Sequence, residues 1–117
     1  VKGCGIEYVK SGNPLDVKNF TALVKEGVSY SRENGPAVLL AESPCLLSLS
    51  REEIRERYVK VEVEDTCDGC GYCLSHFECP ALVMAGPEER VVIDYKLCTG
   101  CGVCMSVCPK NSIKTAK

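Results

Sequence analysis

The chain has 117 residues, a length that predicts one ordinary domain or two very small ones. Its 14 basic and 16 acidic residues give a net charge of -2 without a basic stripe, so we expect no nucleic-acid partner. The longest apolar stretch, residues 37–49, is interrupted by Glu42, Ser43 and Pro44 and is too short to span a membrane, so we expect no membrane partner either.

The first part of the chain predicts a strand, a helix and a second strand. Residues 6–9 form a short β-prone run. Asp16 is a favourable N-cap, and apolar residues follow it at helical spacing as far as Asn34-Gly35-Pro36, where we expect a left-handed cap. The continuous apolar run 37–41 has the pattern of a strand covered on both faces in a parallel sheet.

This β-α-β segment is too small to bury its apolar strand alone, so we expect it to be the last unit of a larger α/β domain or a surface that docks onto one. The chain begins Val1-Lys2-Gly3, with neither Met nor a secretory leader, which suggests an interior piece of a longer cytoplasmic protein. The predicted divisions are residues 1–50 for this segment, 51–57 for a charged helical linker capped by Ser50, and 58–117 for a cysteine-rich domain.

The cysteine-rich domain predicts an α+β fold built by internal duplication. Residues 59–64 and 90–94 alternate apolar and polar side chains ahead of a cysteine loop, and short apolar segments at 82–84 and Ile113 follow the two Cys-Pro pairs. Residues 86–89, Gly-Pro-Glu-Glu, are a predicted hairpin turn. We therefore expect two hairpins with short helices.

Eight of the ten cysteines fall into two runs with regular spacing. These runs are Cys67-x2-Cys70-x2-Cys73-x5-Cys79-Pro80 and Cys98-x2-Cys101-x2-Cys104-x3-Cys108-Pro109. The second spacing is that of bacterial two-cluster ferredoxins, in which the fourth cysteine ligates the other four-iron, four-sulfur cluster. By this rule one 4Fe-4S cluster binds Cys67, Cys70, Cys73 and Cys108, and the other binds Cys98, Cys101, Cys104 and Cys79. The sequence therefore predicts an oxygen-sensitive protein that carries single electrons on two clusters.

Two other uses of these cysteines are possible in principle. Zinc also binds paired Cys-x2-Cys steps, but a zinc ribbon needs two cysteines per loop, whereas each loop here offers three at even spacing and adds a remote Cys-Pro. Disulfides are disfavoured because cysteines three residues apart in one tight loop pair poorly. Iron–sulfur ligation is the favoured interpretation.

The remaining candidates near the cysteine runs have less specific signals. Four glycines between the expected ligands suit a backbone that curls closely around a cluster: Gly69, Gly71, Gly100 and Gly102. The first run has two extra residues before its last cysteine, which we expect to change the approach to the second cluster. His76 lies there and is expected to be an exposed loop residue, with tuning of a cluster as the alternative. Cys4 and Cys45 are expected to be small buried hydrophobes.

Several short segments resemble a known family. Glu7-Tyr8-Val9, residues 13–16, the run from Gly35 to Ala41 and Ser43-Pro44-Cys45 are similar to the end of the thiamine-diphosphate domain of indolepyruvate ferredoxin oxidoreductase alpha subunits. The longer first cysteine run, ending in Cys79-Pro80-Ala81-Leu82, also resembles that family's first run. The resemblance covers essentially the whole chain, and its cysteine motifs are much more specific than its α/β part.

The resemblance implies an electron-transfer role in a larger enzyme. Members of the family oxidatively decarboxylate arylpyruvates to acyl-CoA with thiamine diphosphate and Mg²⁺, and iron–sulfur clusters pass the electrons singly to a ferredoxin. This chain contains no Gly-Asp-Gly thiamine motif and no catalytic residue, so it would need the rest of the alpha subunit and a beta subunit as partners, with a soluble ferredoxin as the acceptor. The alternative is an independent ferredoxin-type carrier, or a subunit of another oxidoreductase, whose N-terminal piece serves only for docking.

Overall fold

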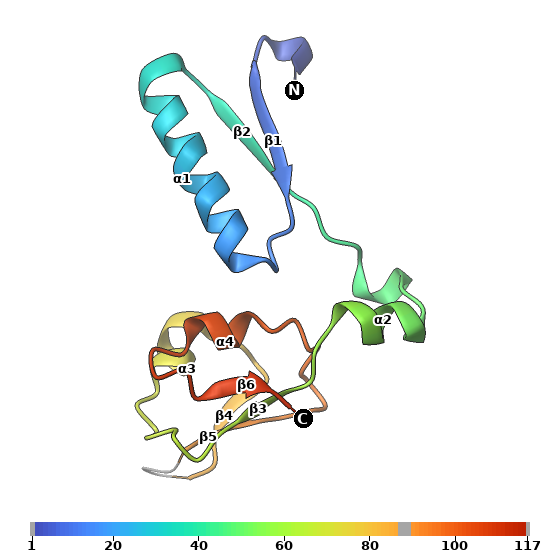
Figure 1. The fold of residues 1–117 in the computed structure, drawn as a ribbon, viewed down its shortest axis with the longest axis vertical. Helices are drawn as coiled ribbons and strands as arrows, with labels where there is room; N and C mark the ends of the chain where they lie inside the picture. Colours follow the sequence, from blue (N-terminus) through green and yellow to red (C-terminus); the bar gives the residue numbers. More distant parts are fainter. Residues whose placement is uncertain (1, 87–89, 117) are drawn as a thin grey trace. The chain divides into compact units, whose positions relative to one another are not determined.

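A computed structural model describes residues 2–86 and 90–116. The chain is a small α+β protein that divides into two compact units, residues 1–48 and 49–117, each of which can be followed along the chain in Figure 1. Within the described residues, no helix has the length and apolar character needed to cross a membrane.

The first unit is a parallel β-α-β segment. Strand β1 (Tyr8–Gly12) leads into helix α1 (Val17–Asn34), which returns the chain to strand β2 (Ala37–Ala41) beside β1, in a register that pairs Tyr8 with Ala37 and Gly12 with Ala41. Short 3-10 turns lie at Lys2–Cys4 and Leu46–Ser48. The predicted order of strand, helix and strand is confirmed, although β1 starts two residues later than the β-prone run 6–9.

Local sequence signals explain the ends of α1. The Asp16 carboxylate accepts a hydrogen bond from the backbone N–H of Asn19 at 3.2 Å, which satisfies one of the free donors of the first turn and confirms the predicted N-cap. Gly35 ends the helix with φ of 112° and ψ of -161°, so the predicted glycine cap with a positive φ is present, but its ψ is extended and not that of a left-handed helical residue. The residue uses the extended positive-φ region that is accessible to glycine, because the chain must turn directly into β2.

Helix α1 packs on both strands through glycines. A Cβ atom at Gly12 would lie 3.1 Å from a methyl carbon of Leu23, and one at Gly27 would lie 3.1 Å from a methyl carbon of Leu39. Val24, Val28 and Leu40 nevertheless stay 39%, 46% and 41% exposed, so this unit alone does not cover its apolar side chains.

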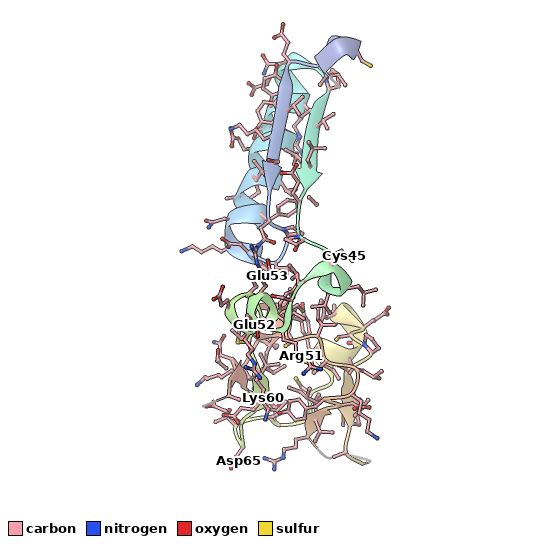
Figure 2. All side chains as sticks on the ribbon, turned by 90° about the vertical axis from the view of Figure 1, so that its right-hand side faces the viewer. Cys45, Arg51, Glu52, Glu53, Lys60 and Asp65 are labelled. Carbon is pink, nitrogen blue, oxygen red and sulfur yellow. The ribbon has the colours of Figure 1, made fainter. Side chains whose placement is uncertain are left out.

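Helix α2 (Arg51–Arg57) opens the second unit and depends on its cap. The Ser50 hydroxyl accepts from the backbone N–H of Glu53, and the Glu53 carboxylate accepts from the backbone N–H of Ser50, which together make a capping box. The hydrogen bond from the backbone N–H of Ser50, followed by one from its side chain, holds the pKa of Glu53 below its usual value. Figure 2 labels Glu53 on this helix, which buries none of its residues.

The rest of the second unit holds two short antiparallel strand pairs and two short helices. Strand β4 (Leu82–Met84) pairs with the next strand, β5 (Val91–Ile93), as predicted, although part of the predicted turn at 86–89 lies outside the described residues. Strand β3 (Val61–Val63) pairs with β6 (Ile113–Thr115), the first and last strands of the duplicated region. The prediction of two hairpins is therefore wrong for this pair, because β3 comes from the first half of the duplicated region and β6 comes from the second half. Helices α3 (Tyr72–Phe77) and α4 (Val103–Val107) follow the cysteine loops.

The core of the second unit repeats the duplication. Each strand contributes one buried apolar residue, and each short helix contributes one buried cysteine. These residues are Val61, Leu82, Val91, Ile113, Cys73 and Cys104. Among the described residues this central cluster is small, and two of its six side chains are cysteines, so apolar burial is a limited source of stability for this unit.

Candidate metal-cluster sites

The structure gathers the eight cysteines of the two runs into two sets of four. Cys67, Cys70, Cys73 and Cys108 line one cavity, named site 1 here. Cys79, Cys98, Cys101 and Cys104 line a second cavity of about 160 Å³, named site 2. Each set has three members from one run and a fourth from the other, the same grouping as the sequence predicts.

Matching elements place the members of each set. At site 1, Cys67 and Cys70 lie in the loop after β3, and Cys73 lies on α3. At site 2, Cys98 and Cys101 lie in the loop after β5, and Cys104 lies on α4. The fourth member comes from the opposite half, since Cys108 caps α4 and Cys79 follows α3. The pairing of β3 with β6 brings the end of the second half back to the first loop.

The two cysteine loops have glycines with positive φ at corresponding positions. Four glycines have φ between 68° and 76°, and two of them begin α3 and α4: Gly69, Gly71, Gly100 and Gly102. Gly100 cannot be replaced freely, because a Cβ atom there would lie 2.8 Å from the backbone oxygen of Val59. The backbone N–H of Val59 donates to the Gly100 carbonyl at 2.8 Å, so the segment after α2 is attached directly to the loop of site 2.

The pKa values of the buried thiols reflect the same grouping. Burial raises the pKa of Cys104 to about 11, with a further rise from Cys101, Cys98 and Cys79. Burial also raises the pKa of Cys73, with smaller contributions from Cys108, Cys67 and Cys70. Both buried thiols are therefore neutral at pH 7 in the metal-free chain, and metal binding there must release protons.

The two extra residues before Cys79 do not lengthen the connection in which they lie. Eight residues, 74–81, separate Cys73 from the buried Leu82 of β4, and eight residues, 105–112, separate Cys104 from the buried Ile113 of β6. Leu82 and Ile113 hold matching positions, opposite Ile93 and Val63. The remote cysteine is therefore displaced by two positions within a connection of fixed length.

Sequence reasoning missed Ser112, which is only 1% exposed and joins the two halves beside site 1. Its backbone N–H donates to Cys108 Sγ at 3.3 Å, and its hydroxyl accepts from the Thr66 hydroxyl at 3.0 Å. Its carbonyl accepts from the backbone N–H of Glu64 at 2.8 Å. An alignment of the two connections on their strand residues, Leu82 and Ile113, could have revealed it. In that alignment Ser112 takes the position equivalent to Ala81.

An ion pair at site 1 was also missed. Lys110 Nζ lies 3.2 Å from Asp68 Oδ2, and Asp68 Oδ1 accepts from the backbone N–H of Cys70 at 3.3 Å. Lys110, followed by the Cys70 N–H, holds the pKa of Asp68 below its usual value. The pair ties the segment after Cys108 to the loop that carries Cys67 and Cys70.

The structure corrects three expectations about residues outside the two sets. His76 is exposed as expected but lies on α3, where its ring stacks on Tyr72 with 4.0 Å between the ring centroids. Cys4 and Cys45 are exposed, so the prediction that they are buried hydrophobes is wrong. Both lie outside the packed strands and α1, where the first unit has little core to cover them.

The cavities beside the two cysteine sets differ in size, with about 160 Å³ at site 2 and about 10 Å³ at site 1. In the part of the chain that the structure describes, no three His, Cys, Asp or Glu side chains converge closely enough to hold a single metal ion. A 4Fe-4S cluster does not need such convergence, because each thiolate binds a different iron atom. Four cysteines per site match the ligand set of that cluster.

Comparison with known proteins finds similarity to an iron–sulfur family and to subunits of one oxidoreductase. The family model described as "4Fe-4S binding domain" matches residues 91–114, which include the cysteines from Cys98 to Cys108. The "Indolepyruvate oxidoreductase subunit IorA" of Archaeoglobus fulgidus is 39% identical over 118 residues, an alignment that covers 100% of this chain and 18% of that protein. The proteins of the same name from Methanothermobacter marburgensis and Methanothermobacter thermautotrophicus are 34% and 35% identical, and each alignment covers 97% of this chain and 17% of the relative. The chain thus spans less than a fifth of the length of these relatives.

Proposed function

This chain belongs to the family of IorA subunits of indolepyruvate oxidoreductase and corresponds to their C-terminal part, and on that basis we propose that it holds two 4Fe-4S clusters and relays electrons from 2-oxo acid oxidation to a ferredoxin. The observation that carries the proposal is the gathering of eight cysteines into two separate sets of four with crossed membership. The proposed ligands are Cys67, Cys70, Cys73 and Cys108 at site 1 and Cys98, Cys101, Cys104 and Cys79 at site 2.

The residues around the two sites suit this use. When bound, a 4Fe-4S cluster accepts and gives up one electron at a time. Apolar side chains such as Phe77, Leu82 and Ile93 line site 2 and would keep water away from its cysteines. At site 1 the backbone N–H of Ser112 already points at a ligand sulfur. The crossed membership lets both sites lie in one small unit, which suits transfer between them.

The first unit supports a larger enzyme rather than a free carrier. Val24, Val28 and Leu40 are partly exposed on a two-stranded sheet with one helix, which is the state expected of a piece cut from a wider α/β layer. The proposed layer is the thiamine-diphosphate domain of the same subunit. It would supply thiamine diphosphate and Mg²⁺, and the beta subunit would complete the enzyme in the cytoplasm.

The cluster content is tested by purifying the chain without oxygen and measuring iron and acid-labile sulfide. Two complete sets of four cysteines predict about eight of each per chain. The control is a variant in which all four cysteines of site 1 are replaced by Ala, for which we expect about four of each. Stoichiometric zinc, or disulfides without iron, would refute the iron–sulfur proposal.

The relay is tested in the assembled enzyme. We expect arylpyruvate-dependent reduction of ferredoxin to be lost when the cysteines of both sites are replaced, while the thiamine site still binds the oxo acid. The 117-residue chain alone should be reduced and reoxidised but should not decarboxylate a 2-oxo acid when thiamine diphosphate, Mg²⁺ and coenzyme A are added. Unchanged ferredoxin reduction after removal of both sites would show that this module is only a structural appendage.

A further inference from the structure

The two cysteine sites share a scaffold but differ in the charges and hydrogen bonds around them. None of the described residues that line site 2 carries a charge, and most of them are apolar. Site 1 has the Asp68 carboxylate in its lining, with the Lys110 ammonium 3.2 Å from it. Corresponding positions in the loops hold Asp68 at site 1 and Thr99 at site 2.

Ala81 of site 2 is the position whose equivalents at site 1 carry the charge and the hydrogen bonds. Counted from the Cys-Pro pairs, Ala81 at site 2 matches Lys110 at site 1. Counted back from the buried strand residues Leu82 and Ile113, it matches Ser112 instead. The displacement of Cys79 by two positions thus leaves one alanine where site 1 has both a lysine and a buried serine.

Ser112 directs its backbone N–H toward Cys108 Sγ, and two further bonds fix its place. The Thr66 hydroxyl donates to its hydroxyl, and the Glu64 N–H donates to its carbonyl. A hydrogen bond to a ligand sulfur favours the more negative, reduced state of a cluster and therefore raises its reduction potential. Solvent exposure acts in the same direction, and Cys70 of site 1 is exposed whereas every cysteine of site 2 is partly or fully buried.

The ion pair of Asp68 and Lys110 places two opposite charges beside site 1, and removal of either one changes the net charge there. Lys110 neutralises Asp68, whose other oxygen is held by the backbone N–H of the ligand Cys70. Without Lys110, a bare carboxylate would stand beside the ligand loop and disfavour the electron. Without the Asp68 charge, the ammonium would favour it.

We propose that site 1 holds the cluster of higher reduction potential and is the point from which electrons leave. Ser112, Asp68 and Lys110 set the reduction potential of that cluster. The inference rests on the proposed two-cluster function. An electron that moves between the two clusters settles on site 1, because transfer toward the higher potential is favourable. Site 2 is then the cluster that receives the electron, and its loop is attached to the segment that follows α2.

The test uses the full chain, loaded with iron and sulfide, in an anaerobic redox titration followed by electron paramagnetic resonance. We expect two midpoint potentials. Lys110→Ala should lower only the higher one, and Asp68→Asn should raise only the higher one while keeping the oxygen that accepts from the Cys70 N–H. Lys114→Ala is the matched control, because Lys114 pairs with Glu64 at 2.9 Å with similar exposure but lies outside both cysteine sites.

Each outcome of the titration is decisive. A shift confined to the lower midpoint in the Lys110→Ala and Asp68→Asn proteins would place site 1 at the lower potential and overturn the inference. Equal shifts in these variants and in Lys114→Ala, or no shift at all, would remove the specific role of the pair. The shifts should also shrink in high salt, which a purely structural effect would not do. An iron content below two clusters per chain would instead refute the proposed function itself.

Discussion

Cys79 and Cys108 serve corresponding roles from positions that do not match. Each is the remote member of its site, yet Cys79 lies two positions nearer to its strand than Cys108 does within a connection of the same length. The fold therefore fixes the number of residues between the helix cysteine and the strand, whereas the sequence position of the remote cysteine within that connection differs between the two sites. This freedom leaves room at site 1, but not at site 2, for Lys110 and Ser112 between the Cys-Pro pair and the strand.

Crossed membership gives a specific prediction for the remote cysteines. Under anaerobic conditions, replacing Cys79 by Ala should expose the other three cysteines of site 2 to alkylation, namely Cys98, Cys101 and Cys104. The cysteines of site 1 should stay protected. Cys108→Ala should do the reverse and free Cys67, Cys70 and Cys73. Mass spectrometry of alkylated peptides reads out the pattern. Cys45→Ala is the control, since Cys45 is exposed and belongs to neither site.

The opposite alkylation pattern would be equally clear. If Cys79→Ala freed Cys67, Cys70 and Cys73, each run would bind its own cluster, and the two sites would have to be assigned again. Loss of protection at all seven remaining cysteines of the two runs in both variants would mean that the two clusters are lost together.

Gly100 has less room for a side chain than Gly71 or Gly102 in the cysteine loops. We expect Gly71→Ala, at φ of 68° with open space around it, to cost about 1–2 kcal/mol from backbone strain alone. Gly100→Ala, at φ of 76°, should cost roughly 1–3 kcal/mol more, because its Cβ would lie 2.8 Å from the backbone oxygen of Val59. Bleaching of the cluster absorbance in guanidinium chloride should therefore begin at clearly lower denaturant for Gly100→Ala. Equal midpoints would show that the segment at Val59 can move away from the loop.

At the scale of elements, local signals predicted the first unit well and the second unit only in part. The Asp16 cap and the apolar run 37–41 identify α1 and β2 without reference to the rest of the chain. The partner of β3 could not be predicted in this way, because it is β6, some 50 residues later. An alternating pattern shows that a segment is a strand but does not show which strand it pairs with.

The candidate sites also contain one part that local sequence signals predict and one part that depends on contacts between distant segments. Cysteine spacing, together with the known crossing rule, was enough to group the eight cysteines. The surrounding groups were not predictable, because Ser112 and Lys110 act on a loop more than 40 residues before them through contacts that exist only after β3 and β6 pair. A serine or lysine in such a position has no pattern of its own in the sequence.

Helix α2 is an element whose stability should depend on one side chain. It has seven residues and buries none of them, so its capping box supplies much of what holds it. Ser50→Ala should cost about 1 kcal/mol and increase hydrogen exchange at the backbone amides of Ile54 and Tyr58 roughly fivefold. Ser48→Ala is the matched control, because the Ser48 hydroxyl bonds to the Cys45 carbonyl outside the helix. An equal effect of both variants, or none from Ser50→Ala, would show that packing rather than the cap holds α2.

At the scale of the whole molecule, the two units depend on different sources of stability. The first unit has continuous backbone hydrogen bonding in α1 and between two parallel strands, but it leaves apolar side chains exposed. The second unit has strands of only three residues each and a core of six side chains. Small domains of this kind need an additional link, and the proposed clusters would provide eight covalent ones.

Removing iron should therefore unfold the second unit and spare the first. Chelation without oxygen takes away the links between the halves and leaves Cys73 and Cys104 as buried neutral thiols in a core too small to hold the fold. Hydrogen exchange resolved by segment should show the amides of β3 and β6 losing their protection, while exchange in α1 and β2 stays at its earlier rate. Addition of iron and sulfide should restore the protection. The four-Ala variant of site 1, which keeps the cysteines of site 2, tests the cause, because its β3–β6 pair should already be less protected than that of the intact protein before any chelator is added. If chelation left β3 and β6 protected, the apolar core alone would hold the second unit, and if α1 lost its protection at the same time, the two units would fold as one.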